Sequence, residues 1–302
     1  MSKRRRKLPN TSFIKRRLQV RLTLAKGSFG SGNTVVIDNH AMRVSVEKLG
    51  PPDFAKASVE IFGMNLNDIE QLTSLSFHPF KLTRNYINIF AGDDESGLSQ
   101  IFAGSITAAN GDLSGCPEHK LKIDAEVGFW GRVTAQGPNV INGTQAAASF
   151  IETQATKAGM TFSNEGVSDA LKNCVFSGSP VEQARQAAKQ IGADLLIDDD
   201  EMILLPRQGN RKGNAVLLNK DSGLLGYPAI TSNGIECKSI FNPAFRFAGL
   251  FVLESIVPKA SGTWRVIKLT HKLSANDPSD GSWESSITGF YPALSGAVGK
   301  LI

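Results

Sequence analysis

Apolar and polar side chains alternate along most of the first 136 residues, and this pattern constrains the fold more than any other feature. Residues 18–24 (LQVRLTL) are the clearest case. A period of two residues is typical of β-strands with one buried face. Six or more such strands predict an antiparallel sandwich or barrel. The other candidate strands lie within residues 42–46, 59–61, 86–90, 101–109 and 121–127, separated by turn clusters rich in glycine and proline.

One short helix is predicted inside this β region, over residues 65–75. An asparagine at position 65 or 67 can cap its first turn. The spacing of its apolar residues predicts one buried face, formed by Leu66, Ile69, Leu72 and Thr73.

The period changes to 3.6 residues after residue 136. Residues 143–157 predict a helix that ends at Gly159. Residues 179–182 (SPVE) form a capping box with proline at the first helical position, and predict a second helix that ends at Gly192. A hairpin is predicted over residues 194–205. Together these elements predict a small α/β insert over residues 137–208.

Strand patterns return after the insert, and prolines mark the ends of the candidate strands, where proline is tolerated. The chain is therefore predicted to be mainly β, with two related antiparallel barrels over residues 18–136 and 209–302, although no sequence repeat is evident. The candidate strands of the second region are residues 215–218, 235–240, 250–255, 263–273 and 283–290.

The net charge of +5 is concentrated at the start of the chain. Residues 1–21 hold nine Lys and Arg and no Asp or Glu, so the rest of the chain is mildly acidic. Such a body is atypical of proteins that bind nucleic acid on one basic face. Residues 1–17 predict a flexible basic arm, which is either a solvated tail or a segment that binds a partner. The candidate binding residues are Lys3, Arg4, Arg5, Arg6, Lys7, Lys15, Arg16 and Arg17.

The residue types that carry most enzyme chemistry are present without the spacing that this chemistry needs. The three cysteines form no CxxC pair, and the four histidines form no HExxH or HxH motif. The glycine-rich residues 27–32 have no helix after them, which phosphate binding requires. We therefore predict no catalytic, cofactor-binding or metal-binding residues, and no cofactor. The scattered histidines are predicted to lie on the surface or in turns.

Three other patterns favour ordinary structural roles. The acidic run 198–201 (DDDE) lacks the ligand spacing and glycine of a calcium loop, so we predict a solvated hairpin turn. Asp93, Asp94 and Glu95 receive the same interpretation. The aromatic residues beside Arg246 and Arg265 are predicted to be core residues rather than a platform for bases. No stretch approaches the ~20 apolar residues that a membrane helix needs, so no membrane contact is predicted.

Several short sequence motifs follow one another in a fixed order along the chain. They are residues 101–106 (IFAGSI), 111–118 (GDLSGCPE), 159–166 (GMTFSNEG), 193–203 (ADLLIDDDEMI), 223–228 (GLLGYP), 241–243 (FNP), 262–266 (GTWRV), 269–273 (LTHKL) and 281–283 (GSW). Taken in this order, over about residues 18–290, they resemble the baseplate hub proteins of contractile-tailed bacteriophages. These proteins are related to the late control D proteins and to the hub half of type VI secretion spikes.

The resemblance implies a structural protein of the virion tail baseplate, assembled in the host cytoplasm. It implies a homotrimer in which each chain contributes two tube-like β-barrels to a pseudo-sixfold ring. Such a ring joins the hexameric tail tube protein to the trimeric central spike protein. It implies no catalytic residues, so we predict that the chain is not an enzyme. Tape-measure and baseplate wedge proteins are further candidate partners.

The two end segments of the chain are also predicted to contact partners. The arm is predicted to contact packaged DNA, the tape-measure protein or an acidic neighbouring subunit. The apolar end of the chain, residues 291–302, is predicted to dock on the spike or on a neighbouring protomer. The alternative functions are a tail-associated peptidoglycan hydrolase and a nucleic-acid-binding protein that uses the arm.

Overall fold

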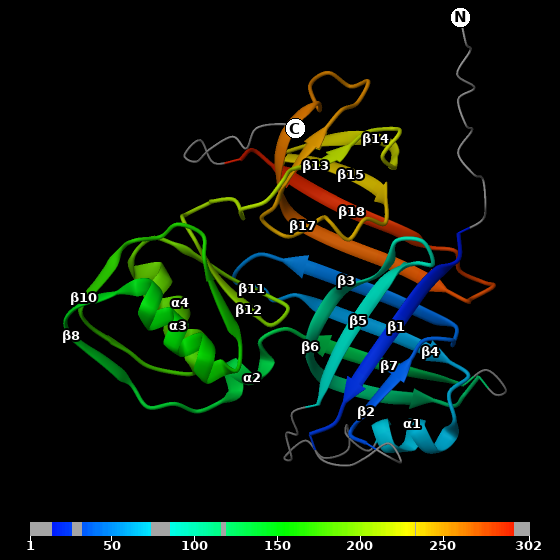
Figure 1. Cartoon of the computed structure of the whole chain (residues 1–302), viewed down its shortest axis with the longest axis horizontal. Coiled ribbons are helices and arrows are strands. Elements are labelled where there is room, and N and C mark those ends of the chain that lie inside the picture. Colours follow the sequence, from blue (N-terminus) through cyan, green and yellow to red (C-terminus); the bar gives the residue numbers. More distant parts are fainter. Residues whose placement is uncertain (1–13, 26–31, 74–84, 116–118, 233, 293–302) are drawn as a thin grey trace, which may run out of the picture.

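Strands from both sides of the insert join one large sheet in the computed structural model (Figure 1). The structure describes residues 14–25, 32–73, 85–115, 119–232 and 234–292. The fold is mainly β, as predicted, and the α/β insert projects from one side of the sheet (Figure 1). Among the described residues, no helix is long and apolar enough to cross a membrane.

The described residues of the first β region form seven strands and one short helix. Its pairing order is β2-β1-β5-β6-β7-β4-β3, and neighbouring strands are antiparallel. Asn65 precedes the helix and its side chain accepts a hydrogen bond from the Asn67 amide, as the capping prediction expects. The elements are β1 (Arg16–Thr23), β2 (Thr34–Ile37), β3 (Met42–Leu49), β4 (Lys56–Phe62), α1 (Leu66–Thr73), β5 (Tyr86–Asp93), β6 (Gly97–Asp112) and β7 (Lys120–Glu126).

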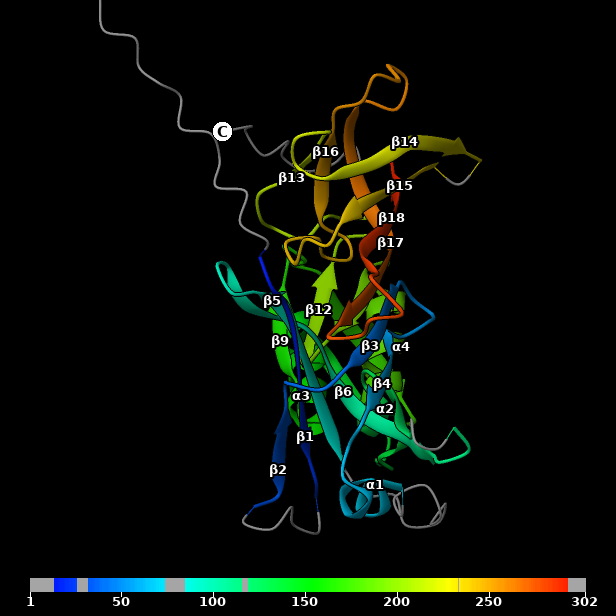
Figure 2. The ribbon, with the colours of Figure 1, turned by 90° about the vertical axis from the view of Figure 1, so that its right-hand side faces the viewer.

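The second β region follows the insert and stacks at one end of the first region (Figures 1 and 2). Its pairing order is β14-β15-β18-β17-β16-β13, in which only the short β13 is parallel to its neighbour. Strand β14 was not predicted, because its apolar residues are largely exposed and follow no clear alternation. The elements are β13 (Val216–Leu218), β14 (Leu224–Thr231), β15 (Gly234–Ile240), β16 (Leu250–Leu253), β17 (Gly262–Ala275) and β18 (Trp283–Phe290).

The long strand β17 connects the two regions. Its first half pairs with β16, and its second half pairs with β3 of the first region over residues 268–275. The ladders therefore continue from one region into the other, and the described strands form an open 13-stranded sheet. Two closed barrels are predicted from the sequence, but the strand pairing of the described residues closes neither region into a barrel. The two regions nevertheless hold two apolar cores: the first lies among β1 to β7 and also includes Phe241 and, from β17, Leu273 and Ala275, and the second lies among β13 to β18.

The insert packs two helices against short strands. Gly159 ends α3 with a φ of 75°, which glycine adopts without strain, and Ser179 and Glu182 form the expected capping box of α4. The predicted hairpin is β11 and β12, and β12 also pairs with β9. The elements are α2 (Phe129–Val133), β8 (Asn139–Ala146), α3 (Ala147–Ala158), β9 (Thr161–Asn164), β10 (Ala170–Phe176), α4 (Pro180–Gln190), β11 (Asp194–Asp198) and β12 (Glu201–Leu205).

Candidate functional site: a charged junction between insert and sheet

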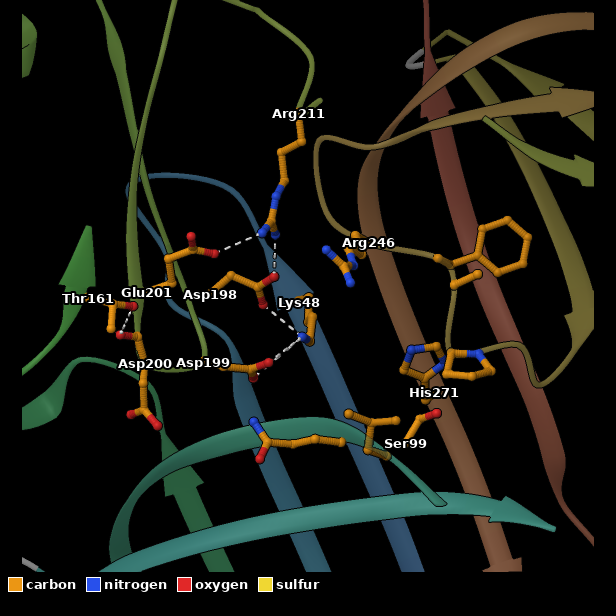
Figure 3. Close-up of a pocket in the computed structure, with 15 residues that line it drawn as sticks. Lys48, Ser99, Thr161, Asp198, Asp199, Asp200, Glu201, Arg211, Arg246 and His271 are labelled. Atoms are coloured by element: carbon orange, nitrogen blue, oxygen red, sulfur yellow. Dashed lines mark hydrogen bonds and ion pairs between the residues drawn. The ribbon is translucent and has the colours of Figure 1, made fainter. Parts of the chain in front are cut away.

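A cavity of about 720 Å³ lies where the insert meets the sheet (Figure 3). The turn between β11 and β12 brings four acidic residues to it, and strands β3 and β17 bring Lys48 and His271. Arg211, which precedes β13, and Arg246, which precedes β16, also line it. The cavity therefore joins residues from the insert and from both β regions.

Lys48 is the centre of the junction. Its side chain is buried, and its Nζ lies 2.7 Å from Asp198 Oδ1 and 3.5 Å from the carboxylate of Asp199. Burial opposes the charge on Lys48, but the two carboxylates outweigh it and raise the lysine pKa. Lys48 is therefore charged at neutral pH and fixes β3 to the hairpin of the insert.

Asp198 is held between two cations. Its second oxygen accepts a hydrogen bond of 2.6 Å from Arg211, which also donates to Glu201 at 3.0 Å. Burial alone would raise the pKa of Asp198, yet Lys48 and Arg211 hold it below its usual range. These four side chains form a continuous chain of ion pairs (Figure 3).

Asp199 is the strained member of the group. It sits in the hairpin turn with a φ of 56°, and its carboxylate accepts a 3.0 Å hydrogen bond from the Ala103 amide of β6. Burial, together with the nearby charge of Asp198, raises the pKa of Asp199 to about 6 in spite of Lys48. The junction thus holds one carboxylate that titrates close to neutral pH.

His271 faces the same junction from β17. Its Nδ1 lies 2.8 Å from Ser285 Oγ, and burial lowers the histidine pKa to about 3, helped by the charge of Lys48. His271 is therefore neutral at physiological pH. The prediction of surface or turn histidines is wrong for this residue.

The prediction of a solvated turn over residues 198–201 is also wrong for part of the run. Asp200 is exposed, whereas Asp198 and Asp199 are largely buried against Lys48. The burial of the two carboxylates could not be predicted from the sequence, because Lys48 lies 150 residues away from Asp198. The sequence of an acidic run does not show which distant lysine or arginine will form an ion pair with it.

A second contact holds the insert to the sheet through an aromatic ring. The guanidinium carbons of Arg132 and Arg185 lie 4.0 and 4.1 Å from the centre of the Phe54 ring. Arg185 also donates a 3.1 Å hydrogen bond to the Pro52 carbonyl. Burial, and then the charge of Arg132, lower the pKa of Arg185. Cation–π contacts of this kind fix orientation as well as adding stability.

Comparison with known families identifies the chain. The family model described as Baseplate hub gp41 matches residues 17–279, which is most of the sequence. The chain belongs to this family. The hub is therefore a structural protein of a phage tail, as the sequence resemblance implies, and the family places it in the tail of a virion.

Solved structures support the fold of the hub. The 43 kDa tail protein of prophage MuSo2 from Shewanella oneidensis aligns with a TM-score of 0.61 at 7% identity, over 91% of this chain and 97% of that one. A tail protein from Neisseria meningitidis MC58 also scores 0.61, at 8% identity over 91% and 96%. The E. coli type VI secretion component c3393, described as similar to the T4 tail proteins gp27 and gp5, scores 0.56 at 9% identity over 85% and 74%. Comparison with curated protein sequences gives no match.

The residues predicted for the basic arm of the hub fall into two groups. Lys3, Arg4, Arg5, Arg6 and Lys7 lie outside the described residues. Arg16 and Arg17 belong to β1, which begins two residues earlier than the predicted first region. Arg17 pairs with Asp94 at 3.5 Å, and Arg16 donates to the Gly281 carbonyl at 2.9 Å with its guanidinium over Trp283. Lys15 precedes β1, and its carbonyl accepts from the Asp94 amide.

Other sequence candidates take structural roles in the hub. Phe245, Phe247 and Trp264 are buried, as predicted, so they offer no platform for bases. Asp94 and Glu95 form an exposed turn, also as predicted. The glycine-rich loop lies mostly outside the described residues. Within the described part of the chain, no three His, Cys, Asp or Glu side chains are grouped to hold a metal ion.

Proposed function

We propose that the hub is the trimeric adaptor between the hexameric tail tube and the trimeric central spike. The observation that carries the proposal is a repeat in strand pairing. The order β3-β4-β7-β6-β5 in the first region recurs as β14-β15-β18-β17-β16 in the second. Within each five-stranded unit a hairpin (β3-β4 or β14-β15) comes first along the chain, and three strands joined in sequence (β5-β6-β7 or β16-β17-β18) follow it.

The repeat extends to the position of a β-bulge. The pairing of β6 with β7 shifts between Ile106 and Ala108, and the pairing of β17 with β18 shifts between Val266 and Lys268. A bulge at the same place of the same strand pair supports two equivalent units in one chain. Three chains would then present six similar units to a sixfold tube and three identical faces to a threefold spike.

The test is the absolute mass of the purified chain in solution, measured by light scattering at low and high salt. A trimer of the 32.4 kDa chain gives about 97 kDa. The same measurement is repeated with the tail tube and spike proteins, which are the proposed neighbours. A chain that stays at 32.4 kDa with both partners present would overturn the adaptor function.

We propose that the basic arm strengthens assembly through an acidic partner, such as DNA, the tape-measure protein or a neighbouring subunit. Arg16 and Arg17 have contacts within the chain, so the test removes only the residues before them. Deleting residues 2–13 leaves these contacts in place. The deletion is expected to preserve the trimer and to weaken assembly most at low salt, where charge contacts are strongest. Unchanged assembly would refute the role of the arm.

A non-enzymatic role is favoured by the family and by structural neighbours that are tail proteins. The described charged groups of the junction neutralise one another, and this arrangement suits attachment more than catalysis. We infer that the hub does not hydrolyse peptidoglycan. Clearing of a cell-wall suspension by the purified chain would contradict this inference.

A further inference from the structure

Strand β14 is an edge strand whose apolar side chains are poorly covered. Ile230 pairs directly with Ile235 of β15, so both side chains point to the same face of the sheet. Ile235 is fully buried in the second core, whereas Ile230 is 57% exposed. Leu225 and Tyr227 of the same strand are also exposed. Exposed apolar edges are rare in isolated proteins, because they favour association.

The equivalent strand of the first region has the cover that β14 lacks. In the repeat, β14 corresponds to β3 and Ile230 corresponds to Val46, which pairs with Ala57 just as Ile230 pairs with Ile235. On its other side, Val46 pairs with His271 in the second half of β17. Val46 is 0% exposed. The contact with β17 therefore completes the burial of the first region within the chain.

The repeat also indicates which surface of a neighbouring chain would cover β14. His271 lies five residues beyond Val266 at the bulge of β17, and Gly111 lies five residues beyond Ile106 at the bulge of β6. At this position β17 meets β3, whereas the Gly111 amide of β6 donates a 3.1 Å hydrogen bond to Thr73 Oγ1 of α1. Helix α1 therefore packs on the part of β6 that is equivalent, in the repeat, to the part of β17 that pairs with β3.

Helix α1 offers an apolar side chain to a neighbour. Ile69 and Leu72 are buried against the first core, as the predicted helix face requires, but Leu66 is 56% exposed. Contrary to the sequence prediction, Leu66 does not belong to the buried face. A β14 edge and an α1 surface are therefore two different apolar surfaces of one chain. Different surfaces that meet between copies generate a closed ring when the rotation permits it.

We propose that β14 of one copy packs on α1 of the next copy, at the position equivalent to the one where β3 pairs with β17 inside each chain. The inference rests on the proposed trimer and names its interface. Ile230 and Tyr227 of one copy then cover Leu66 of the next. The occupant of the β14 edge is a second copy of the hub.

The test compares Ile230→Lys and Leu66→Lys with a matched control, Val175→Lys. Val175 is 62% exposed on β10 of the insert, away from the proposed interface. All three changes place a lysine at an exposed apolar position, so folding is expected to persist, and circular dichroism checks it. A lysine in the centre of an interface should raise the trimer dissociation constant about 30-fold or more. The two interface variants should therefore shift towards 32.4 kDa on dilution, while Val175→Lys should match the wild-type chain.

A cross-linking experiment tests the pairing of the two surfaces directly. One copy carries Ile230→Cys and another carries Leu66→Cys, and the mixture is oxidised. A covalent dimer is expected in the mixture and not with either variant alone. A wild-type chain that never trimerises would overturn the adaptor function and this interface together. A wild-type trimer that survives Ile230→Lys and Leu66→Lys as well as the control does would overturn the interface alone.

Discussion

The interior of the insert is held by apolar contacts, whereas its attachment to the rest of the chain adds ion pairs to apolar contacts. Its interior is apolar: Phe150 packs against Phe176 with ring centres 5.1 Å apart, and Ile151 and Val181 are fully buried beside them. Its attachment to β3 is ionic, through Lys48 and Asp198. Most residues of the interior belong to the insert itself, with Phe54 added from the loop before β4, whereas the ionic attachment joins residues 150 positions apart.

The difference separates stability from orientation. Apolar contacts stabilise in proportion to buried area and tolerate small changes of angle. Buried ion pairs contribute little net stability over apolar groups, but they are costly to break and have strict geometry. We infer that the apolar interior makes the insert fold, and that the chain of ion pairs sets its angle to the sheet.

The largest effect is expected when the attachment loses one charge. Asp198→Ala leaves Lys48 and Arg211 without their shared carboxylate, and removing one partner of a buried pair costs about 3–5 kcal/mol. Urea unfolding measures the loss. The matched control is Asp94→Ala, which breaks the exposed pair with Arg17 and should cost less than about 1 kcal/mol. Equal losses of unfolding free energy for the two variants would show that the buried ion pairs of the junction stabilise the chain no more than an exposed ion pair does.

A loss of similar or smaller size is expected when the interior of the insert loses packing. Ile151→Ala removes a fully buried side chain of α3 and should cost about 2–5 kcal/mol. Amide hydrogen exchange should accelerate in α3 and α4 and remain slow in β5 and β6, because the cores are separate. Acceleration of the same size in β5 and β6 would show that insert and sheet unfold as one unit.

Elements defined by neighbouring residues could be predicted from the sequence. The capping box at Ser179 and the αL glycine at 159 fix the start of α4 and the end of α3 through local backbone chemistry, and both are present. The hairpin of β11 and β12 follows from two apolar runs around an acidic turn. By contrast, β8 and β10 were missed, since few of their side chains are buried and their alternation is weak.

Features that depend on distant parts of the chain could not be predicted. Asp198 is buried where Lys48 and Arg211 pair with it, and His271 is neutral because burial, helped by Lys48, lowers its pKa; only the folded chain brings these groups together. The continuous sheet was missed for a similar reason. A strand of 14 residues can pair with two different strands on one side, and nothing in the sequence of β17 shows that β3 is the second.

The pH dependence of stability between pH 4 and 8 sharpens the comparison, because Asp199 and His271 of the junction bind protons differently in the folded and the unfolded chain, in opposite senses. The pKa of Asp199 is raised from 3.8 to about 6 in the folded chain, so the folded state binds a proton that the unfolded state releases between these values. The contribution of Asp199 is therefore present at low pH and is lost as pH rises from about 4 to 6. The loss is at most about 3 kcal/mol. Asp198 acts in the opposite sense, since its pKa is lowered and its contribution is lost when pH falls below about 4.

Urea unfolding between pH 4 and 8 tests this titration with Asp199→Asn. His271 acts in the opposite sense over the same range, since its pKa is lowered from 6.5 to about 3 and its contribution is lost as pH falls below about 6.5. Both chains share this slope, so only the wild-type chain should add the Asp199 loss of about 3 kcal/mol between pH 4 and 6. The stability of Asp199→Asn relative to the wild-type chain should therefore rise over this range. Identical pH profiles for the two chains would show that Asp199 is not the titrating group.

The smallest effect is expected at the start of α4, where the insert depends on a local contact. Ser179 accepts a hydrogen bond from the Glu182 amide, and Glu182 accepts one from the Ser179 amide at 2.8 Å. Ser179→Ala should cost about 1 kcal/mol, because one amide of the first turn loses its partner. The control is Thr156→Ala, an exposed change within α3 whose hydroxyl donates to the Glu152 carbonyl, and a change below about 0.5 kcal/mol is expected. The angle of the insert should not respond to either variant, so the trimer mass and the pH profile should match the wild-type chain. A changed pH profile in Ser179→Ala would show that the interior and the attachment are coupled, and the separation of their roles would then be wrong.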